Sequence, residues 1–180
     1  MRSKHVRDMV LAAMFLGLGW ILPLLTGNIP EIGGMLLPMH LPVLLCGIIL
    51  GPRYGFLIGL ILPISRSLLF GMPPFPVAAV PMTFELAAYG GIIGILYGKL
   101  SKTIPSIYIS LIVAMLAGRV VWAAARVAML GLMEVPFSFN IFLTSAFVSS
   151  WPGIVLQIVL IPALIIAIKK SGWERSVQHS

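Results

Sequence analysis

The feature that most constrains this chain is a series of long apolar segments separated by short connectors. A helix needs about 20 apolar residues to cross the hydrocarbon core of a bilayer. We predict six membrane spans, at about residues 6–25, 39–51, 54–70, 78–100, 104–131 and 141–169. The expected fold class is an all-α integral membrane protein, in which a six-transmembrane-helix bundle forms a single membrane domain over residues 1–180.

Composition supports lipid as the main solvent of this chain. Hydrophobic residues make up 59% of the sequence and charged residues 9%, whereas a soluble domain carries about 25% charged residues. The formal net charge is +7, but the basic residues come in twos and threes between apolar segments. Because they form no dense patch, we expect no nucleic-acid partner.

Lysine and arginine follow the pattern of membrane topology. With six spans, one face of the membrane receives Arg2, Lys4, Arg7, Arg53, Lys99, Lys102, Lys169, Lys170 and Arg175. The connectors on the other face, at about 26–38, 71–77 and 132–140, hold no Lys or Arg. The positive-inside rule therefore predicts a multi-pass protein of the bacterial cytoplasmic membrane with both termini in the cytoplasm.

Four charged residues fall within the predicted spans: Arg66, Glu85, Arg119 and Arg126. Each costs about 2.5–3.5 kcal/mol at the centre of a membrane helix, so each needs a compensating role. One interpretation is structural, with Glu85 paired to one arginine while the others reach an interface. The predicted topology places all four in the outer half of the bundle, which favours a pocket that opens to the outside.

Other polar and aromatic side chains fall at the same depth. Arg119 and Arg126 lie nearly two helical turns apart, about 10 Å along the axis, and Trp122 lies between them as either a ligand contact or a packing residue. The predicted substrate-binding residues are His40, Arg66, Glu85, Arg119, Trp122, Arg126, Asn140, Trp151 and Gln157. An excess of arginine favours a small anion, because guanidinium groups suit carboxylates and phosphates.

The segment MLLPMHLPVLLCG, residues 35–47, places His40 between Pro38 and Pro42. Pro42 is expected in the first turn of the second span, where its missing N–H costs little. We therefore expect His40 at the mouth of the pocket, where it contacts the ligand, caps the helix or meets water.

The sequence holds no recognisable catalytic or metal-binding motif. A GxxxxGK[ST] loop, HExxH and GxSxG are absent, and the one cysteine, Cys46, excludes a cysteine-rich zinc site. We expect no enzymatic activity, no cofactor and no metal. Two alternatives to a binding protein stay open: a self-sufficient proton-coupled small-solute carrier that uses Glu85, and a structural membrane subunit without a ligand.

Small residues recur at a spacing of four, at Gly47/Gly51, Gly55/Gly59 and Gly90/Gly94/Gly98. This spacing lets helix backbones approach closely. In the first predicted span, Ala13 and Gly17 form a similar pair, which could pack within the bundle or dock a partner.

The strings LPMHLPVLLCG, GPRYG, LLFGMPP and FELAAYG lie within about residues 35–98. With six short spans and no ATP site, they resemble the substrate-binding S components of energy-coupling factor (ECF) transporters, and within these the pantothenate-type subgroup. The likeness in overall plan covers nearly the whole chain, while residues 104–180 resemble the family in pattern only.

This resemblance implies a shared bundle fold, capture of a vitamin from outside, and docking to a transmembrane scaffold subunit and, through it, two cytoplasmic ATPase subunits. It makes the connector at about 26–38 a lid over the ligand. The family docks its scaffold through Ala-x-x-x-Ala on the first span, which corresponds here to Ala13 and Gly17. An anionic vitamin such as pantothenate is the first candidate, with nicotinate, a folate, or a neutral pyrimidine- or pyridoxine-type ligand left open.

Overall fold

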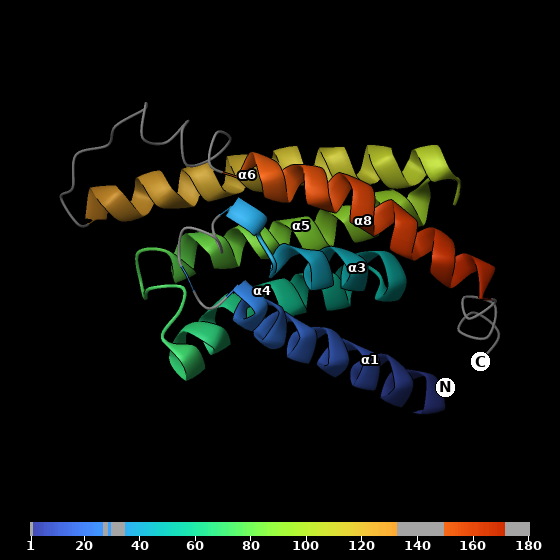
Figure 1. The fold of residues 1–180 in the computed structure, drawn as a ribbon, viewed down its shortest axis with the longest axis horizontal. Coiled ribbons are helices and arrows are strands. Elements are labelled where there is room, and N and C mark those ends of the chain that lie inside the picture. Colours follow the sequence, from blue (N-terminus) through green and yellow to red (C-terminus); the bar gives the residue numbers. More distant parts are fainter. Residues whose placement is uncertain (1, 27–28, 30–34, 133–149, 172–180) are drawn as a thin grey trace.

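The computed structural model describes residues 2–26, 29, 35–132 and 150–171, and the structural statements that follow concern this part of the chain (Figure 1). Its regular secondary structure is helical throughout. The elements are α1 (Arg2–Ile21), the 3₁₀ helix η1 (Leu22–Thr26), α3 (His40–Leu50), α4 (Pro52–Phe70), α5 (Ala79–Lys99), α6 (Ile104–Leu132) and α8 (Trp151–Lys170).

Five helical segments are long and apolar enough to cross a membrane: Lys4–Leu25, Pro52–Phe70, Ala79–Lys99, Ile104–Leu132 and Trp151–Lys170. Helix α3 has 11 residues. It rises about 16 Å and is too short to cross a hydrocarbon core of about 30 Å alone. The all-helical membrane class is therefore confirmed with five candidate spans among the described residues, and the sixth span stays a prediction. Residues 141–149 of the last predicted span lie outside the described part.

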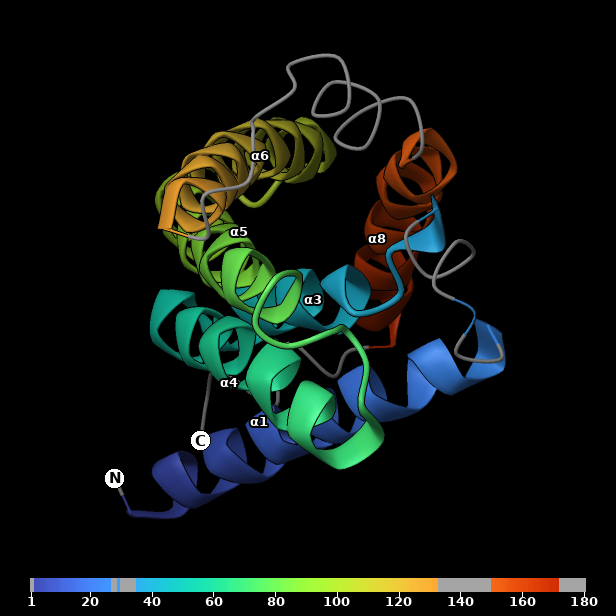
Figure 2. The same cartoon turned by 90° about the vertical axis from the view of Figure 1, so that its left-hand side faces the viewer.

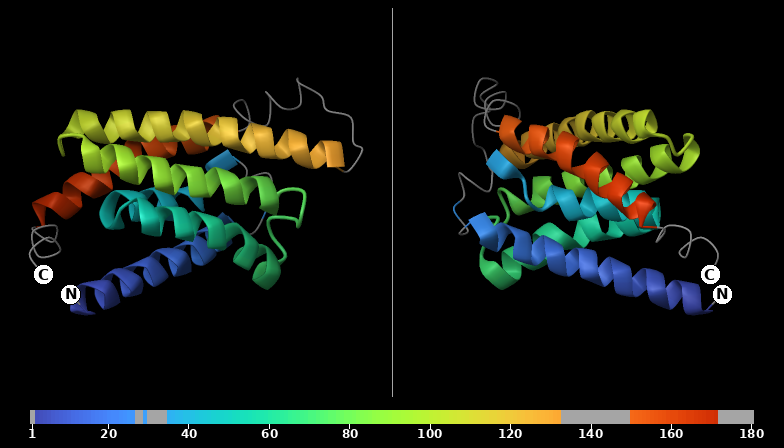
Figure 3. Two further views of the ribbon diagram at one scale, coloured as in Figure 1. Left: turned by 180° about the vertical axis from the view of Figure 1, so that it is seen from behind. Right: turned by 45° about the vertical axis from the view of Figure 1, so that its right-hand side comes forward.

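With the short helix α3 included, consecutive α-helices run in alternating directions, so that α1 begins and α8 ends at the same end of the bundle (Figures 1 and 3). We call this the basic end, because it carries Lys4, Arg7, Arg53, Lys99, Lys102, Lys169 and Lys170. The opposite end carries the connector between α4 and α5, residues 71–78, which has no Lys or Arg. The described helices thus show the charge segregation that the sequence predicts.

The backbones of α3, α4 and α5 touch at glycines. A Cβ atom at Gly47 or Gly55 would lie 2.5 Å from the carbonyl oxygen of Gly90 on α5, closer than real Cβ contacts come. Gly59 meets the backbone of Leu86 in the same way. The predicted close approach is confirmed at these positions, and it fixes how deep and in which rotation the three helices pack.

Two glycines of the same sequence pattern lie outside this contact. Gly51 has a φ of 90° and ends α3, in a conformation that favours glycine. A Cβ atom at Gly98 would meet nothing within 4 Å. Gly98 therefore faces open space at the basic end, not a neighbouring helix.

Figure 2 shows the bundle turned by 90°, with α6 and α8 on one side and α1 on the other, next to α4. Helix α8 also touches the segment that enters α3. A Cβ atom at Gly153 would lie 2.6 Å from the carbonyl oxygen of Met35 and 2.8 Å from the carbonyl carbon of Leu36. This contact holds the beginning of α3 against α8, inside the protein.

Candidate functional site

A buried ion pair joins α5 and α6. The Oε1 atom of Glu85 lies 3.0 Å from Nη1 of Arg119, and the Glu85 side chain is 1% exposed. An unpaired charge in such a place is strongly disfavoured, so the two residues compensate each other. Arg119 also lies over Trp122, with its guanidinium carbon 5.9 Å from the ring centroid, a cation–π distance. Arg119 and Trp122 therefore lie next to each other, as their spacing predicts.

His40 approaches the same carboxylate from α3. Its Nε2 atom lies 3.6 Å from Oε1 of Glu85, and its side chain is 1% exposed. The prediction that His40 lies at the mouth of a pocket is wrong, because the residue is enclosed by protein. The physical reason is that α3 is short and begins beside α8, at the depth of Glu85, so its first residue is already interior.

Tyr89 completes this group, and the sequence reasoning missed it. It lies one helical turn after Glu85 on α5, and its side chain is 1% exposed. Its ring lies 5.2 Å from the His40 ring, centroid to centroid, and packs against Gly118. The signal in the sequence was its i+4 spacing from an intramembrane carboxylate, which puts both side chains on one face.

We call His40, Glu85, Tyr89 and Arg119 the Glu85 cluster. Several of its buried polar atoms make no hydrogen bond with described residues: both ring nitrogens of His40, and Nε and Nη2 of Arg119. Buried polar groups in proteins are nearly always hydrogen-bonded to protein or to a bound molecule. The cluster therefore offers donors and an acceptor to a small polar ligand.

Gln157 on α8 is a further buried polar side chain. It is enclosed by protein, and neither its amide nitrogen nor its amide oxygen has a hydrogen-bond partner among the described residues. It lies one turn beyond Gly153, the residue that touches the segment before α3. Trp151 differs, because its side chain is 61% exposed at the beginning of α8.

Arg66 and Arg126 contact the connector 71–78. Nη1 of Arg66 donates to the carbonyl oxygen of Met72 at 2.6 Å, and Nη1 of Arg126 donates to that of Val77 at 2.5 Å. The Ser67 hydroxyl donates to the carbonyl oxygen of Pro73 at 2.6 Å. Among the described residues, Glu85 thus pairs with one arginine, Arg119, while Arg66 and Arg126 bond to the connector.

The remaining predicted residues divide by position. Asn140 lies outside the described residues, as does most of the expected lid at 26–38. On α1, the Ala13 side chain is exposed and a Cβ atom at Gly17 would meet nothing within 4 Å. The part of the chain that the structure describes contains no group of three or more His, Cys, Asp or Glu side chains that could hold a metal ion.

No curated protein and no solved structure matches the chain at a significant level. The sequence model of one family does match, over residues 7–168, and its description reads ECF transporter, substrate-specific component. The match covers all the candidate spans except the first residues of α1 and the last two of α8. On this match and on the helical membrane architecture, the chain belongs to the family of ECF transporter substrate-specific components.

Proposed function

We propose that this protein captures a vitamin or related micronutrient from outside the cell and delivers it when docked to an ATPase-energised scaffold. The family consists of substrate-binding subunits of ECF importers, which bind a small molecule, dock with scaffold and ATPase subunits, and are not enzymes in general. The observation that carries the proposal for this chain is the Glu85 cluster with its unsatisfied buried polar atoms. Buried polar atoms without hydrogen bonds lower the stability of a purely structural ion pair, whereas in a binding site they can bond to the ligand.

We propose an orientation in which the basic end faces the cytoplasm of a bacterium. Lys and Arg concentrate on cytoplasmic connectors, and the described basic residues outside the spans gather at one end. Both termini are then cytoplasmic, and α3 serves as the sixth, short span. The Glu85 cluster and the connector 71–78 lie toward the outside in this orientation, where a nutrient arrives.

We propose an anionic ligand, with pantothenate as the first candidate from the pantothenate-type strings. Among the described residues of that half, three arginines accompany the single acidic side chain of Glu85. Glu31 and Glu134 lie outside the described part. An excess of arginine raises the local concentration of a carboxylate and offers planar pairs of donors to it.

The proposed substrate-binding residues are those predicted from the sequence, with Tyr89 added. His40, Glu85, Arg119 and Gln157 supply interior polar atoms. Arg66 and Arg126 hold the connector 71–78 beside the site, and Trp122 covers the apolar part of the ligand. We include Asn140 and Trp151 in the proposed set because the sequence places both in the outer half of the last predicted span.

A vitamin screen by thermal shift tests this function. Saturating ligand stabilises a protein by RT ln(1 + [L]/Kd), which is about 2.7 kcal/mol at one hundred times Kd. We expect pantothenate to raise the melting temperature of the purified chain, and Arg119→Gln to abolish the shift while Arg53→Gln at the basic end retains it. Stabilisation by another vitamin alone would remove the pantothenate assignment, and no response to any vitamin would remove the binding function.

The proton-coupled carrier that uses Glu85 is not favoured by the family match. Liposomes that contain this chain alone separate the two functions. We expect no gradient-driven accumulation of ligand in them, because transport in this proposal requires the scaffold and ATPase subunits.

A further inference from the structure

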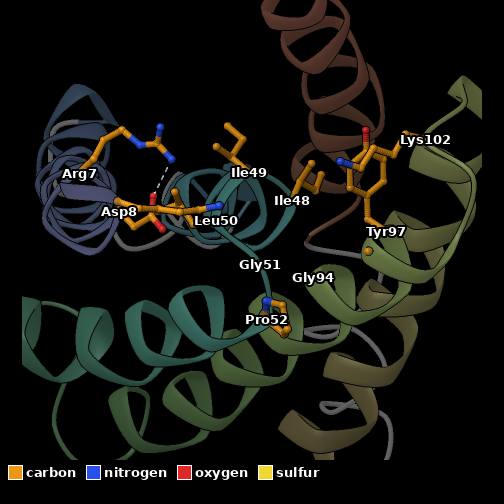
Figure 4. A pocket seen from close by; sticks show the side chains of 12 residues that line it. Arg7, Asp8, Ile48, Ile49, Leu50, Gly51, Pro52, Gly94, Tyr97 and Lys102 are labelled. Atoms are coloured by element: carbon orange, nitrogen blue, oxygen red, sulfur yellow. Dashed lines mark hydrogen bonds and ion pairs between the residues drawn. The ribbon is translucent and has the colours of Figure 1, made fainter. Parts of the chain in front are cut away.

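A cavity lies at the basic end, and no residue of the Glu85 cluster lines it (Figure 4). Its volume is about 320 Å³. It lies between the first two turns of α1, the turn that joins α3 to α4, the end of α5 and the connector to α6. The lining residues are Lys4, Arg7, Asp8, Ile48, Ile49, Leu50, Gly51, Pro52, Gly94, Tyr97, Gly98 and Lys102.

The cavity is positively charged. Lys4, Arg7 and Lys102 line it together with one acidic residue, Asp8, so the lining carries a formal charge of 3 − 1 = +2. Nη2 of Arg7 lies 3.2 Å from Oδ1 of Asp8, which holds the guanidinium group in place (Figure 4). Lys169 adds a further positive charge near the cavity. Its Nζ atom donates to the carbonyl oxygen of Lys102, a lining residue, at 2.7 Å.

Tyr97 provides an independent indication of a ligand. Its side chain is 3% exposed, and its hydroxyl makes no hydrogen bond with the described residues although the residue lines the cavity. A buried hydroxyl without a partner is uncommon. Nζ of Lys169 lies 5.4 Å from the centroid of the Tyr97 ring, which places another cation beside this hydroxyl-bearing ring. A phosphate oxygen is a suitable acceptor for such a hydroxyl.

Part of the cavity wall is apolar, and the cavity has room for more than an ion. Ile48, Ile49 and Leu50 at the end of α3 form it. A Cβ atom at Gly51 or Gly98 would meet nothing within 4 Å, so these glycines leave the cavity open. Cations beside an apolar wall match a headgroup whose phosphate continues into a hydrocarbon chain.

We propose that this cavity binds a phosphate group, carried by an anionic membrane phospholipid. The proposal does not rest on the vitamin-binding function, because it concerns other residues at the other end of the bundle. A soluble phosphate offers the same chemical group as a phospholipid headgroup. The experiment therefore compares binding of lipids with binding of soluble phosphates.

The test measures binding to the full chain in a neutral detergent by native mass spectrometry. The probes are phosphatidylglycerol, phosphatidylcholine, glycerol 3-phosphate and inorganic phosphate. We expect phosphatidylglycerol to bind more tightly than phosphatidylcholine. The double variant Lys4→Gln/Lys102→Gln and the variant Gly98→Leu should each weaken phosphatidylglycerol binding by about tenfold. The leucine fills the cavity without removing a charge.

Lys99→Gln is the matched control, because Lys99 is exposed at the same end and does not line the cavity. It should leave binding within about twofold of the original. Equal binding of the two lipids, an equal loss in Lys99→Gln and the double variant, or full binding by Gly98→Leu would each overturn the proposal. Binding of the soluble phosphates with the same dependence on Lys4, Lys102 and Gly98 would retain the phosphate site and assign its ligand to a soluble source.

Discussion

The carboxylate of Glu85 on α5 lies 3.0 Å from the guanidinium group of Arg119 on α6, and protein encloses both side chains. His40 on α3 lies 3.6 Å from the same carboxylate, and the Tyr89 ring on α5 contacts the His40 ring. Three helices therefore contribute polar groups to one interior point in a chain that is 59% hydrophobic.

Breaking the pair from either side should destabilise the fold more than removing both charges. Glu85→Gln and Arg119→Gln should each cost about 3–5 kcal/mol, because each leaves a buried charge without its partner. The double variant should recover part of this loss. A double-mutant cycle on unfolding in detergent measures the coupling. Additive single effects would show that the two charges do not interact in the folded protein.

Tyr89→Phe should weaken ligand binding with little effect on packing. The phenylalanine ring keeps the contacts with His40 and Gly118, and the variant loses only the hydroxyl group of a residue that lies one helical turn from Glu85. In the proposed site this hydroxyl donates to the anionic ligand. A hydrogen bond to a charged group contributes about 1.5–3 kcal/mol, so affinity should fall by about tenfold or more in a titration with the ligand found by the screen. Tyr97→Phe at the basic end is the matched control and should bind that ligand normally.

Arg126→Ala should lower ligand affinity by about tenfold or more, because it removes a positive charge and releases the carbonyl oxygen of Val77. Arg126→Lys should give a smaller loss, since the charge stays while the planar donor group is gone. Isothermal titration with the same ligand compares the two variants. Unchanged affinity in Arg126→Ala would take this residue out of the binding site.

Gly90→Ala should destabilise the protein by about 1–3 kcal/mol or more, because the added Cβ atom would collide with the backbone of Gly55. Gly98→Ala on the same helix is the control. Its Cβ atom would meet open space, so the higher helix propensity of alanine should leave stability equal or raise it by up to about 1 kcal/mol. Thermal unfolding in one detergent compares the pair, and equal melting temperatures would contradict the close packing of α4 on α5.

Gly17→Leu should prevent assembly with the scaffold while ligand binding persists. Ala13 is exposed and Gly17 has free space above it, so this face of α1 is available to a partner helix. Leu18→Phe, at an exposed position on another side of α1, is the control for added bulk. Co-purification with the scaffold and ATPase subunits measures assembly. Normal assembly of Gly17→Leu would move the docking surface elsewhere.

Much of the architecture could be predicted from the sequence. Apolar segment lengths predicted the helices, and the described helix ends fall within a few residues of most predicted bounds. The alternation of basic residues predicted that α1 begins where α8 ends, because each crossing changes the face on which a connector lies. Glycine spacing predicted close backbone approach, and the structure shows it between α3, α4 and α5, although Gly98 shares the spacing and faces open space.

The candidate site was harder to predict. The sequence presented three arginines as equal partners for Glu85, and periodicity alone could not choose among them. The structure pairs Arg119 with Glu85, while Arg66 and Arg126 donate to the carbonyl oxygens of Met72 and Val77. Tyr89 was overlooked because a tyrosine in an apolar helix usually reads as a packing residue.

The sequence by itself determined that this chain enters a membrane, which segments become helices, and that its intramembrane charges need partners, since these follow from hydrocarbon thickness and the cost of desolvating charge. Tertiary structure alone decided which partners meet. Backbone contacts at Gly47, Gly55, Gly59 and Gly90 set the depth and rotation of α3, α4 and α5. Such contacts join residues far apart in the chain. A local pattern therefore showed that Glu85 needs a partner, while packing determined that His40 and Arg119 lie beside it.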